Sequence, residues 1–190
     1  MHNAILGADY ARVILGLESP RVGLLTIGTE EGKGNALIAE THELLKKVNG
    51  IVNYVGPIEG FQVFRNHVDV VVCDGFVGNT LLKTWESLAK FITGMLKDEL
   101  KQSPVRLAGA MLAKGAFDAL KSRMNPDRYG GAPLLGVNGI CLIAHGSSEA
   151  KTIKNAIRNS RQYVANHING AIVARLAEVS SVVRHEQEPA

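Results

Sequence analysis

Four consecutive residues, His145, Gly146, Ser147 and Ser148, combine groups that suit the binding of a small anion. The glycine permits a tight turn and the two serines offer hydroxyl groups. A helix that is predicted to follow adds free backbone N–H groups at the positive end of its dipole. The motif is also explained without a ligand. In that interpretation a serine caps the helix and the histidine is a hydrogen-bonded structural residue.

A second loop rich in glycine, Gly28 to Asn35, follows an apolar run and carries one cation, Lys33. Its glycines permit close approach of the backbone to a ligand, and Lys33 could reach a phosphate. The loop is not a P-loop, because Gly34 stands where that motif requires serine or threonine. It also lacks the glycine spacing of a dinucleotide loop, and a flexible loop leading into a helix is the simpler interpretation.

A third polar turn begins at Asp74, directly after the apolar run VDVVVC. Asp74 could cap the next helix, orient a lysine or bind Mg²⁺. One carboxylate in one loop is weak evidence for a metal, so no metal site is predicted. Asn79 and Lys83 lie one helical turn apart and could face the same cleft.

Strand-like and helix-like segments alternate along the chain, which predicts an α/β fold with a mainly parallel sheet. The third strand is so uniformly apolar that it is expected to be buried on both faces. Ligands bind at the carboxyl ends of such strands, so the three polar turns are expected to lie close together. The predicted strands are 21–28, 51–56, 68–75 and 139–144.

A long amphipathic helix is predicted after residue 79, and a further apolar helix over 103–124. Arg106 and Lys114 are interleaved with the apolar residues of the second helix. It could belong to the core, form a dimer contact or lie on lipid. Core or dimer contact is the default, because Asp118 and two glycines weaken the membrane interpretation.

The composition suits one globular domain, 1–190, because 46% of the 190 residues are apolar. The two cysteines, Cys73 and Cys141, have no metal spacing and are expected to be reduced and buried. No apolar run is long enough to span a membrane, and the first residues do not resemble a signal peptide. A net charge of +3 argues against a nucleic-acid binder.

Four stretches in this order resemble the C-terminal part of the PlsX-type phosphate acyltransferases: RVGLLTIGTEEGKGN, VDVVVCDGFVGNTLLKTWE, YGGAPLLGVNG and AHGSSEAKTIKNAIRNS. The resemblance runs from about residue 4 to about residue 175. It implies a Rossmann-like α/β/α fold, related to those of isopropylmalate dehydrogenase and phosphotransacetylase. The N-terminal region of the family, with its DAMGGD-like motif, has no counterpart here, so the fold is expected to be N-terminally truncated.

The resemblance implies transfer of a fatty acyl group from acyl carrier protein to inorganic phosphate. The product is an acyl phosphate for phospholipid synthesis, and no cofactor is needed. Family members are cytoplasmic homodimers with a peripheral contact on the inner face of the membrane. A helical hairpin implicated in these contacts corresponds to residues 97–130, which lie within the single domain.

The expected site follows from that chemistry, in which phosphate itself is the nucleophile and no protein nucleophile is required. Gly146, Ser147 and Ser148 are expected to bind phosphate. Lys33 is expected to support the anion or the oxyanion. Asp74 and Asn79 are expected to orient the reacting groups, and His145 to act as a proton donor or an orienter. Acyl carrier protein is acidic, so its docking is assigned to basic residues: Arg106, Lys114, Lys121, Arg123 and Arg128.

Two other functions are alternatives to this one. A dehydrogenase of the related fold would need an aspartate cluster and a dinucleotide loop, and the sequence shows neither. An inactive fragment that only dimerises or binds a partner is the stronger alternative, because the N-terminal region of the family is missing.

Overall fold

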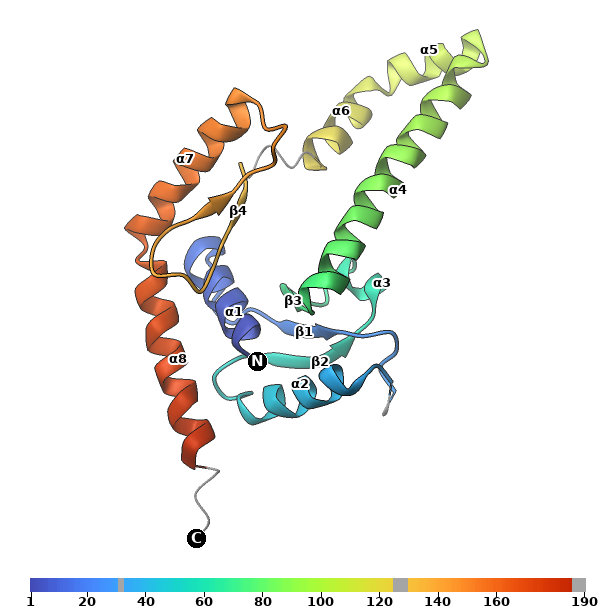
Figure 1. Ribbon diagram of the computed structural model, residues 1–190. Helices are drawn as coiled ribbons and strands as arrows, with labels where there is room; N and C mark the ends of the chain where they lie inside the picture. The colour runs from blue at the N-terminus through green and yellow to red at the C-terminus, as the bar shows by residue number, and fades with distance from the viewer. Residues whose placement is uncertain (31–32, 125–129, 186–190) are drawn as a thin grey trace. The chain divides into compact units, whose positions relative to one another are not determined.

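A computed structural model describes residues 1–30, 33–124 and 130–185. The chain forms two compact units, which are described one at a time (Figure 1). Unit 1 comprises Met1–Cys73 and Tyr129–Ala190, and unit 2 comprises Asp74–Arg128.

Unit 1 is built on a parallel sheet of three strands in the order β2-β1-β3. The strands are β1 (Val22–Leu25), β2 (Tyr54–Ile58) and β3 (Val70–Val72). The helices of unit 1 are α1 (His2–Leu15), α2 (Ala36–Lys47), α3 (Gly60–Val63), α7 (Ala150–Ala165) and α8 (Ile168–His185). Helix α1, with α8 against it, covers one face of the sheet and α2 covers the other (Figure 1). The predicted α/β class is therefore confirmed, in a Rossmann-like layering.

The core of unit 1 lies where α1, α8 and α2 meet the sheet. All four residues of the central strand β1 are buried, as the apolar run predicted. Ile5 of α1, Leu45 of α2 and Val179 of α8 are at most 1% exposed. Such side chains contribute roughly 1.5–3 kcal/mol each through burial. This packing holds α1, α2 and α8 against the sheet.

Polar contacts also hold the elements of unit 1 together. Arg21, just before β1, donates to both carboxylate oxygens of Asp69, just before β3, at 3.0 and 3.1 Å. These bonds lower the pKa of Asp69 below its usual value. Asp9 of α1 is buried between Arg12 and Arg175 of α8, and this burial raises the pKa of its carboxyl group. The second pair joins α1 to α8 directly.

The predicted fourth strand, 139–144, is wrong as a member of the parallel sheet. Only β5 (Leu142–Ile143) is a strand, and it pairs antiparallel with β4 (Ala132–Pro133) in a separate two-stranded sheet. Gly136 and Gly139 have φ values of 82° and 154°, which other residues rarely adopt. These glycines turn the chain back on itself, so β5 pairs with the segment before it instead of extending the parallel sheet.

Unit 2 is helical and consists of α4 (Gly75–Lys101), α5 (Pro104–Leu112) and α6 (Lys114–Arg123). The helix predicted over 103–124 is thus divided at Ala113. None of the three helices contains a buried residue. Within the described residues, no helix combines the length and the apolar character that crossing a membrane requires.

Candidate functional site

The turn between β5 and α7 contains the histidine and serines that the sequence singled out. The backbone N–H of Ser148 donates to the carbonyl oxygen of His145 at 2.9 Å, which closes the turn. The backbone N–H of Ser147 donates to Nδ1 of His145 at 3.2 Å, and the hydroxyl of Ser147 lies 2.6 Å from the same nitrogen. Because a backbone N–H can only donate, Nδ1 must accept, and the proton of the neutral ring is on Nε2.

Helix α7 begins directly after this turn. The helix begins at Ala150 with Glu149 as its N-cap, and Glu149 makes no side-chain capping bond. Ser147 and Ser148 therefore do not cap the helix, which removes the simpler interpretation of these serines. Gly146 and Ser147 are exposed and Ser148 is half-buried. Ser147 and the N–H of Ser148 are bonded to His145, so among the described residues of this turn the hydroxyl of Ser148 and the N–H of Gly146 are the donors left for a small anion.

Two glycines of the preceding hairpin position this turn, and sequence reasoning missed their role. A side chain at Gly130 would place its Cβ in steric clash with the backbone nitrogen of Ala156 in α7. A Cβ at Gly131 would lie 2.7 Å from the carbonyl oxygen of Ile143 in β5, two residues before His145. Both glycines have positive φ, at 76° and 147°. The paired glycines in YGGAP were the available signal.

The side chain of Asn169 holds the other end of the same hairpin. Its Nδ2 donates to the carbonyl oxygens of Val137 and Gly139 at 3.3 and 2.9 Å. Since Asn169 is in α8, the hairpin is attached to both C-terminal helices of unit 1. The turn at 145–148 is therefore carried by a supported hairpin.

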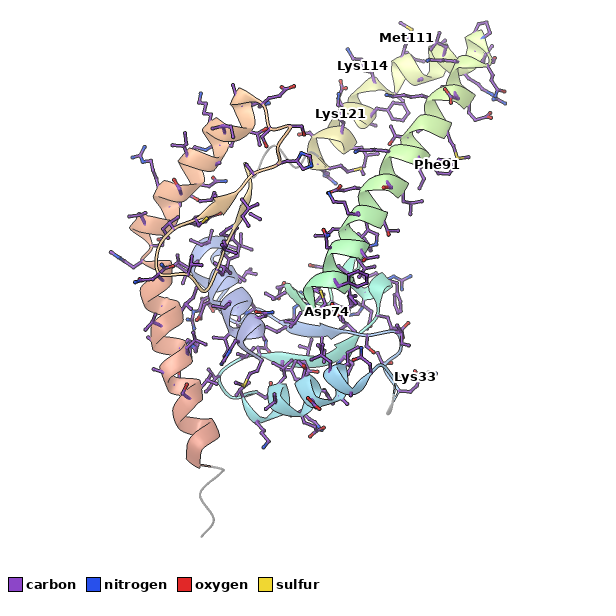
Figure 2. The ribbon with its side chains drawn as sticks, in the orientation of Figure 1. Lys33, Asp74, Phe91, Met111, Lys114 and Lys121 are labelled. Carbon is purple, nitrogen blue, oxygen red and sulfur yellow. The ribbon has the colours of Figure 1, made fainter. Side chains whose placement is uncertain are left out.

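Lys33 lies in the exposed loop that leads from β1 into α2 (Figure 2). Its backbone N–H donates to the carbonyl oxygen of Glu30 at 3.1 Å, and Asn35 caps α2 through Ile38 N at 3.0 Å. In unit 1 this loop and the turn before α7 lie well apart (Figure 1). The reason is the separate pairing of β5, which takes the turn away from the edge of the parallel sheet.

Asp74 is the N-cap of α4 (Figure 2). Its Oδ1 accepts from the backbone N–H groups of Phe76 and Val77, both at 2.9 Å. Of the three roles considered for this carboxylate, helix capping is the one observed. Asn79 and Lys83 line one shallow depression on α4, as their spacing suggested, and Lys83 also pairs with Glu86 at 3.2 Å.

Asp74 and Asn79 belong to unit 2, whereas Lys33 and the 145–148 turn belong to unit 1. The expected meeting of all three polar turns is therefore wrong for the loop at Lys33 and the turn at 145–148, which lie apart within unit 1 (Figure 1). No group of three or more histidine, cysteine or acidic side chains that could hold a metal occurs among the described residues.

Three of the basic residues assigned to docking, Lys114, Lys121 and Arg123, are exposed on α6. Arg106 of α5 is paired with Glu99, with 2.8 Å between Nη1 and Oε2. The fifth residue, Arg128, lies outside the described residues. Unit 2 thus presents cations on the surface of α6 that an acidic partner could contact.

The fold and the glycine-bearing turns define an α/β protein with a Rossmann-like parallel sheet. Residues 1–170 match the family described as fatty acid synthesis protein, and the chain belongs to this family.

Relatives with assigned names support the same grouping. The chain is 49% identical over 175 residues to a phosphate acyltransferase of Geotalea uraniireducens, across 92% of the chain and 50% of that protein. It is 45% identical over 174 residues to a phosphate acyltransferase of Acidobacterium capsulatum, across 92% of the chain and 51% of the relative. A phosphate acyltransferase of Campylobacter jejuni is 46% identical over 178 residues, across 94% and 53%. The chain thus spans about half the length of the curated relatives it matches.

Proposed function

We propose that the chain carries the phosphate-binding part of an enzyme that moves a fatty acyl group from acyl carrier protein to inorganic phosphate. The product would be an acyl phosphate used in phospholipid synthesis. The observation that supports this most is the exposed turn at 145–148, which places the Ser147 and Ser148 hydroxyl groups directly before the start of a helix. Its place in a family whose relatives are named phosphate acyltransferase supports the reaction class.

The chemistry needs little from the protein besides positioning and charge stabilisation. A phosphate oxygen attacks the thioester carbonyl carbon, a C–O bond forms, and the C–S bond breaks. The departing thiolate takes a proton to become the thiol of the carrier protein. Phosphate is already anionic at neutral pH, so it must be held beside the carbonyl, and the developing oxyanion must receive donors.

The proposed roles follow the geometry of each residue. Gly146, Ser147 and Ser148 would bind phosphate, and His145 would orient a reacting group by donating a hydrogen bond from its Nε2–H. The role expected for Lys33, support of the anion or the oxyanion, is not proposed for the turn at 145–148, because the two lie apart within unit 1 (Figure 1).

Asp74 and Asn79 would orient reacting groups from the start of α4. This orienting role would be additional to the helix-capping role of Asp74 that the structure shows.

The whole protein is proposed to act as a cytoplasmic homodimer that docks acidic acyl carrier protein through the basic residues of unit 2. Exposed apolar residues support a second copy or a peripheral membrane contact as the cover of this unit. One face of α4 exposes Phe91 and Ile92 by 64% and 55%, and the end of α5 exposes Met111 and Leu112 by 73% and 91%. An apolar surface this large is rarely left in water.

A second candidate is a module that only dimerises or binds a partner. It is favoured by one observation, that the chain matches about half of each relative's length. In that case the turn at 145–148 would bind phosphate or nothing, and acyl transfer would need the remaining half of the relatives.

The test is acyl-phosphate formation from an acyl carrier protein thioester and phosphate, assayed with this chain and with a full-length relative. Replacing Ser147 and Ser148 together by alanine should raise the KM for phosphate about tenfold or more, because two hydroxyl donors are lost. Ser103→Ala is the matched control, since the Ser103 side chain makes no capping bond. An unchanged KM for phosphate would remove the turn from the site, and activity in the relative alone would favour the binding module.

A further inference from the structure

Helix α7 of unit 1 carries a row of positive charge on its exposed side. Its cations recur every three or four residues, so they share one face of the helix, called here the basic face: Lys151, Lys154, Arg158 and Arg161. All four side chains are exposed, whereas Thr152 and Tyr163 on the other side of the helix are buried. From the first cation to the last, the row is about 15 Å long.

No acidic residue within α7 balances these charges. Several cations on other helices pair with an acid three positions away, as Lys46 does with Glu43 and Lys83 with Glu86. Within the described residues, no cation of the basic face forms an ion pair. Like charges one turn apart repel, and Lys151 lies in the first turn, where the helix dipole disfavours a cation. A charge pattern that weakens its own helix is typical of a functional surface.

An apolar side chain lies beside the cations. Ile157 is 63% exposed and is one helical turn from both Lys154 and Arg161. Ile153, one turn before Ile157, is 42% exposed. Unpaired cations next to an exposed apolar side chain are complementary to a protein helix that carries acidic and apolar side chains.

The basic face begins next to the turn proposed to bind phosphate. Lys151 follows Ser148 by three residues, and α7 leads from the hairpin that carries the turn (Figure 1). The proposed reaction requires a carrier protein to bring its thioester to that phosphate. A protein that docks on α7 would be placed beside the turn within the same unit.

We propose that the basic face of α7 docks an acidic helix of acyl carrier protein, with Ile157 as its apolar contact. This inference rests on the proposed function, which makes the carrier the acyl donor, and the contact would be additional to the one proposed for unit 2. Attraction between the acidic carrier and the cations would speed association, and added salt would weaken it.

A membrane or a nucleic acid fits this face less well. A helix that lies on lipid inserts a broad apolar face, whereas the side of α7 with Thr152 and Tyr163 is packed inside unit 1. Single-stranded nucleic acid stacks on exposed aromatic side chains, and the aromatic residue of α7, Tyr163, is 3% exposed. An acidic protein therefore matches the surface best.

The test is the binding of holo acyl carrier protein, which has a free thiol and no acyl group to transfer, to the full chain by calorimetry. Arg158→Glu should weaken this binding by about fivefold or more, because an acid would then face the acids of the carrier. Lys33→Glu makes the same change of charge at another exposed position of unit 1 and should change binding less than about twofold. Ile157→Ser should weaken binding by about two- to fivefold through the lost apolar contact.

Lys154→Glu separates docking from folding. It replaces repulsion of Lys151 and Arg158 by attraction, so the urea midpoint of the chain should stay the same or rise while carrier binding weakens. A fall in the midpoint together with the loss of binding would assign the cation a structural role and overturn the proposal.

Equal effects of Arg158→Glu and Lys33→Glu on carrier binding would also overturn the proposal. So would an Arg158→Glu variant that loses binding to phosphatidylglycerol vesicles but binds the carrier as before, because the basic face would then contact lipid. The proposed function can fail independently. A chain that binds the carrier through α7 but forms no acyl phosphate would refute the reaction and keep the docking surface, whereas acyl-phosphate formation with an unchanged KM for the carrier in Arg158→Glu would refute only the docking surface.

Discussion

Asp74 has an observed structural role, as the cap of α4, in addition to its proposed role in orienting the reacting groups. Its Oδ1 accepts two backbone N–H bonds at the start of α4, and this satisfies donors that the helix itself leaves free. The sequence predicted the cap correctly as one of three roles, because an acidic residue between an apolar strand and a helix is a common start signal. To test the proposed orienting role, a variant must remove the charge of Asp74 and keep the oxygen that caps the helix.

Replacing Asp74 by alanine should lower the free energy of unfolding of α4 by about 1 kcal/mol, because the two capping bonds are lost. Asn retains the accepting oxygen, so Asp74→Asn should cost less than half of this. Urea unfolding followed by helix ellipticity measures both. If the charge also orients reacting groups, Asp74→Asn should reduce acyl transfer while stability stays near that of the original chain. Equal stability of the alanine variant and the original chain would contradict the capping role.

The sequence singled out His145 as a candidate site residue, but it did not predict the hydrogen bonds of the imidazole ring. The sequence indicated a histidine beside two serines, and the choice between catalyst and structural residue stayed open. That Nδ1 accepts from both the N–H and the side chain of Ser147 depends on side-chain torsions that no spacing encodes. The consequence is an Nε2–H that points away from these bonds and is available to a ligand.

At the scale of elements, the parallel sheet was predictable and the position of the fourth strand was not. The strands near 22, 54 and 70 were found from apolar runs that end at polar turns. The strand at 142 has the same pattern, but its partner is determined by the backbone at Gly136 and Gly139, and glycine alone does not specify a sign of φ. The division of the helix at Ala113 has no glycine or proline signal at that position.

Gly131 tests whether the hairpin positions the turn at 145–148. Gly131→Ala should destabilise unit 1 by about 1–3 kcal/mol, because φ is 147° and the new Cβ would lie 2.7 Å from the carbonyl oxygen of Ile143. It should also change the ¹⁵N resonances of the His145 ring, which report the acceptor state of Nδ1. A purely structural role would leave that ring signal unchanged in the folded protein.

Gly170→Ala is the control for Gly131→Ala, since Gly170 is in α8 and a Cβ there would meet nothing within 4 Å. It should preserve both the stability and the His145 signal. If Gly131→Ala preserved them equally, the hairpin would have no positioning role.

At the scale of the whole molecule, the two units differ in how they bury their apolar residues. Unit 1 has a core with fully buried side chains from helices and sheet. Unit 2 has none among its three helices, although α4 is apolar on more than one side. A 27-residue helix without a buried side chain gains little from packing on its own chain, so we expect another surface to cover it.

The proposed homodimer predicts that a charge on the outward face of α4 lowers the mass of the particle. Ile92→Glu, at a position 55% exposed in the single chain, should convert a dimer to a monomer in sedimentation equilibrium, because an unpaired carboxylate is costly to bury. Lys101→Glu, at the end of the same helix, should leave the mass unchanged. A chain that sediments as a monomer before any substitution would contradict the dimer.

The central claim is that the turn before α7 binds phosphate, and a titration of the ¹⁵N-labelled chain with inorganic phosphate tests it without requiring catalysis. The account predicts saturable shifts concentrated at the backbone amides from Gly146 to Thr152, with binding at least threefold weaker after Ser147 and Ser148 are both replaced by alanine. Shifts that do not saturate, or that are spread evenly over the exposed lysines and arginines, would contradict it.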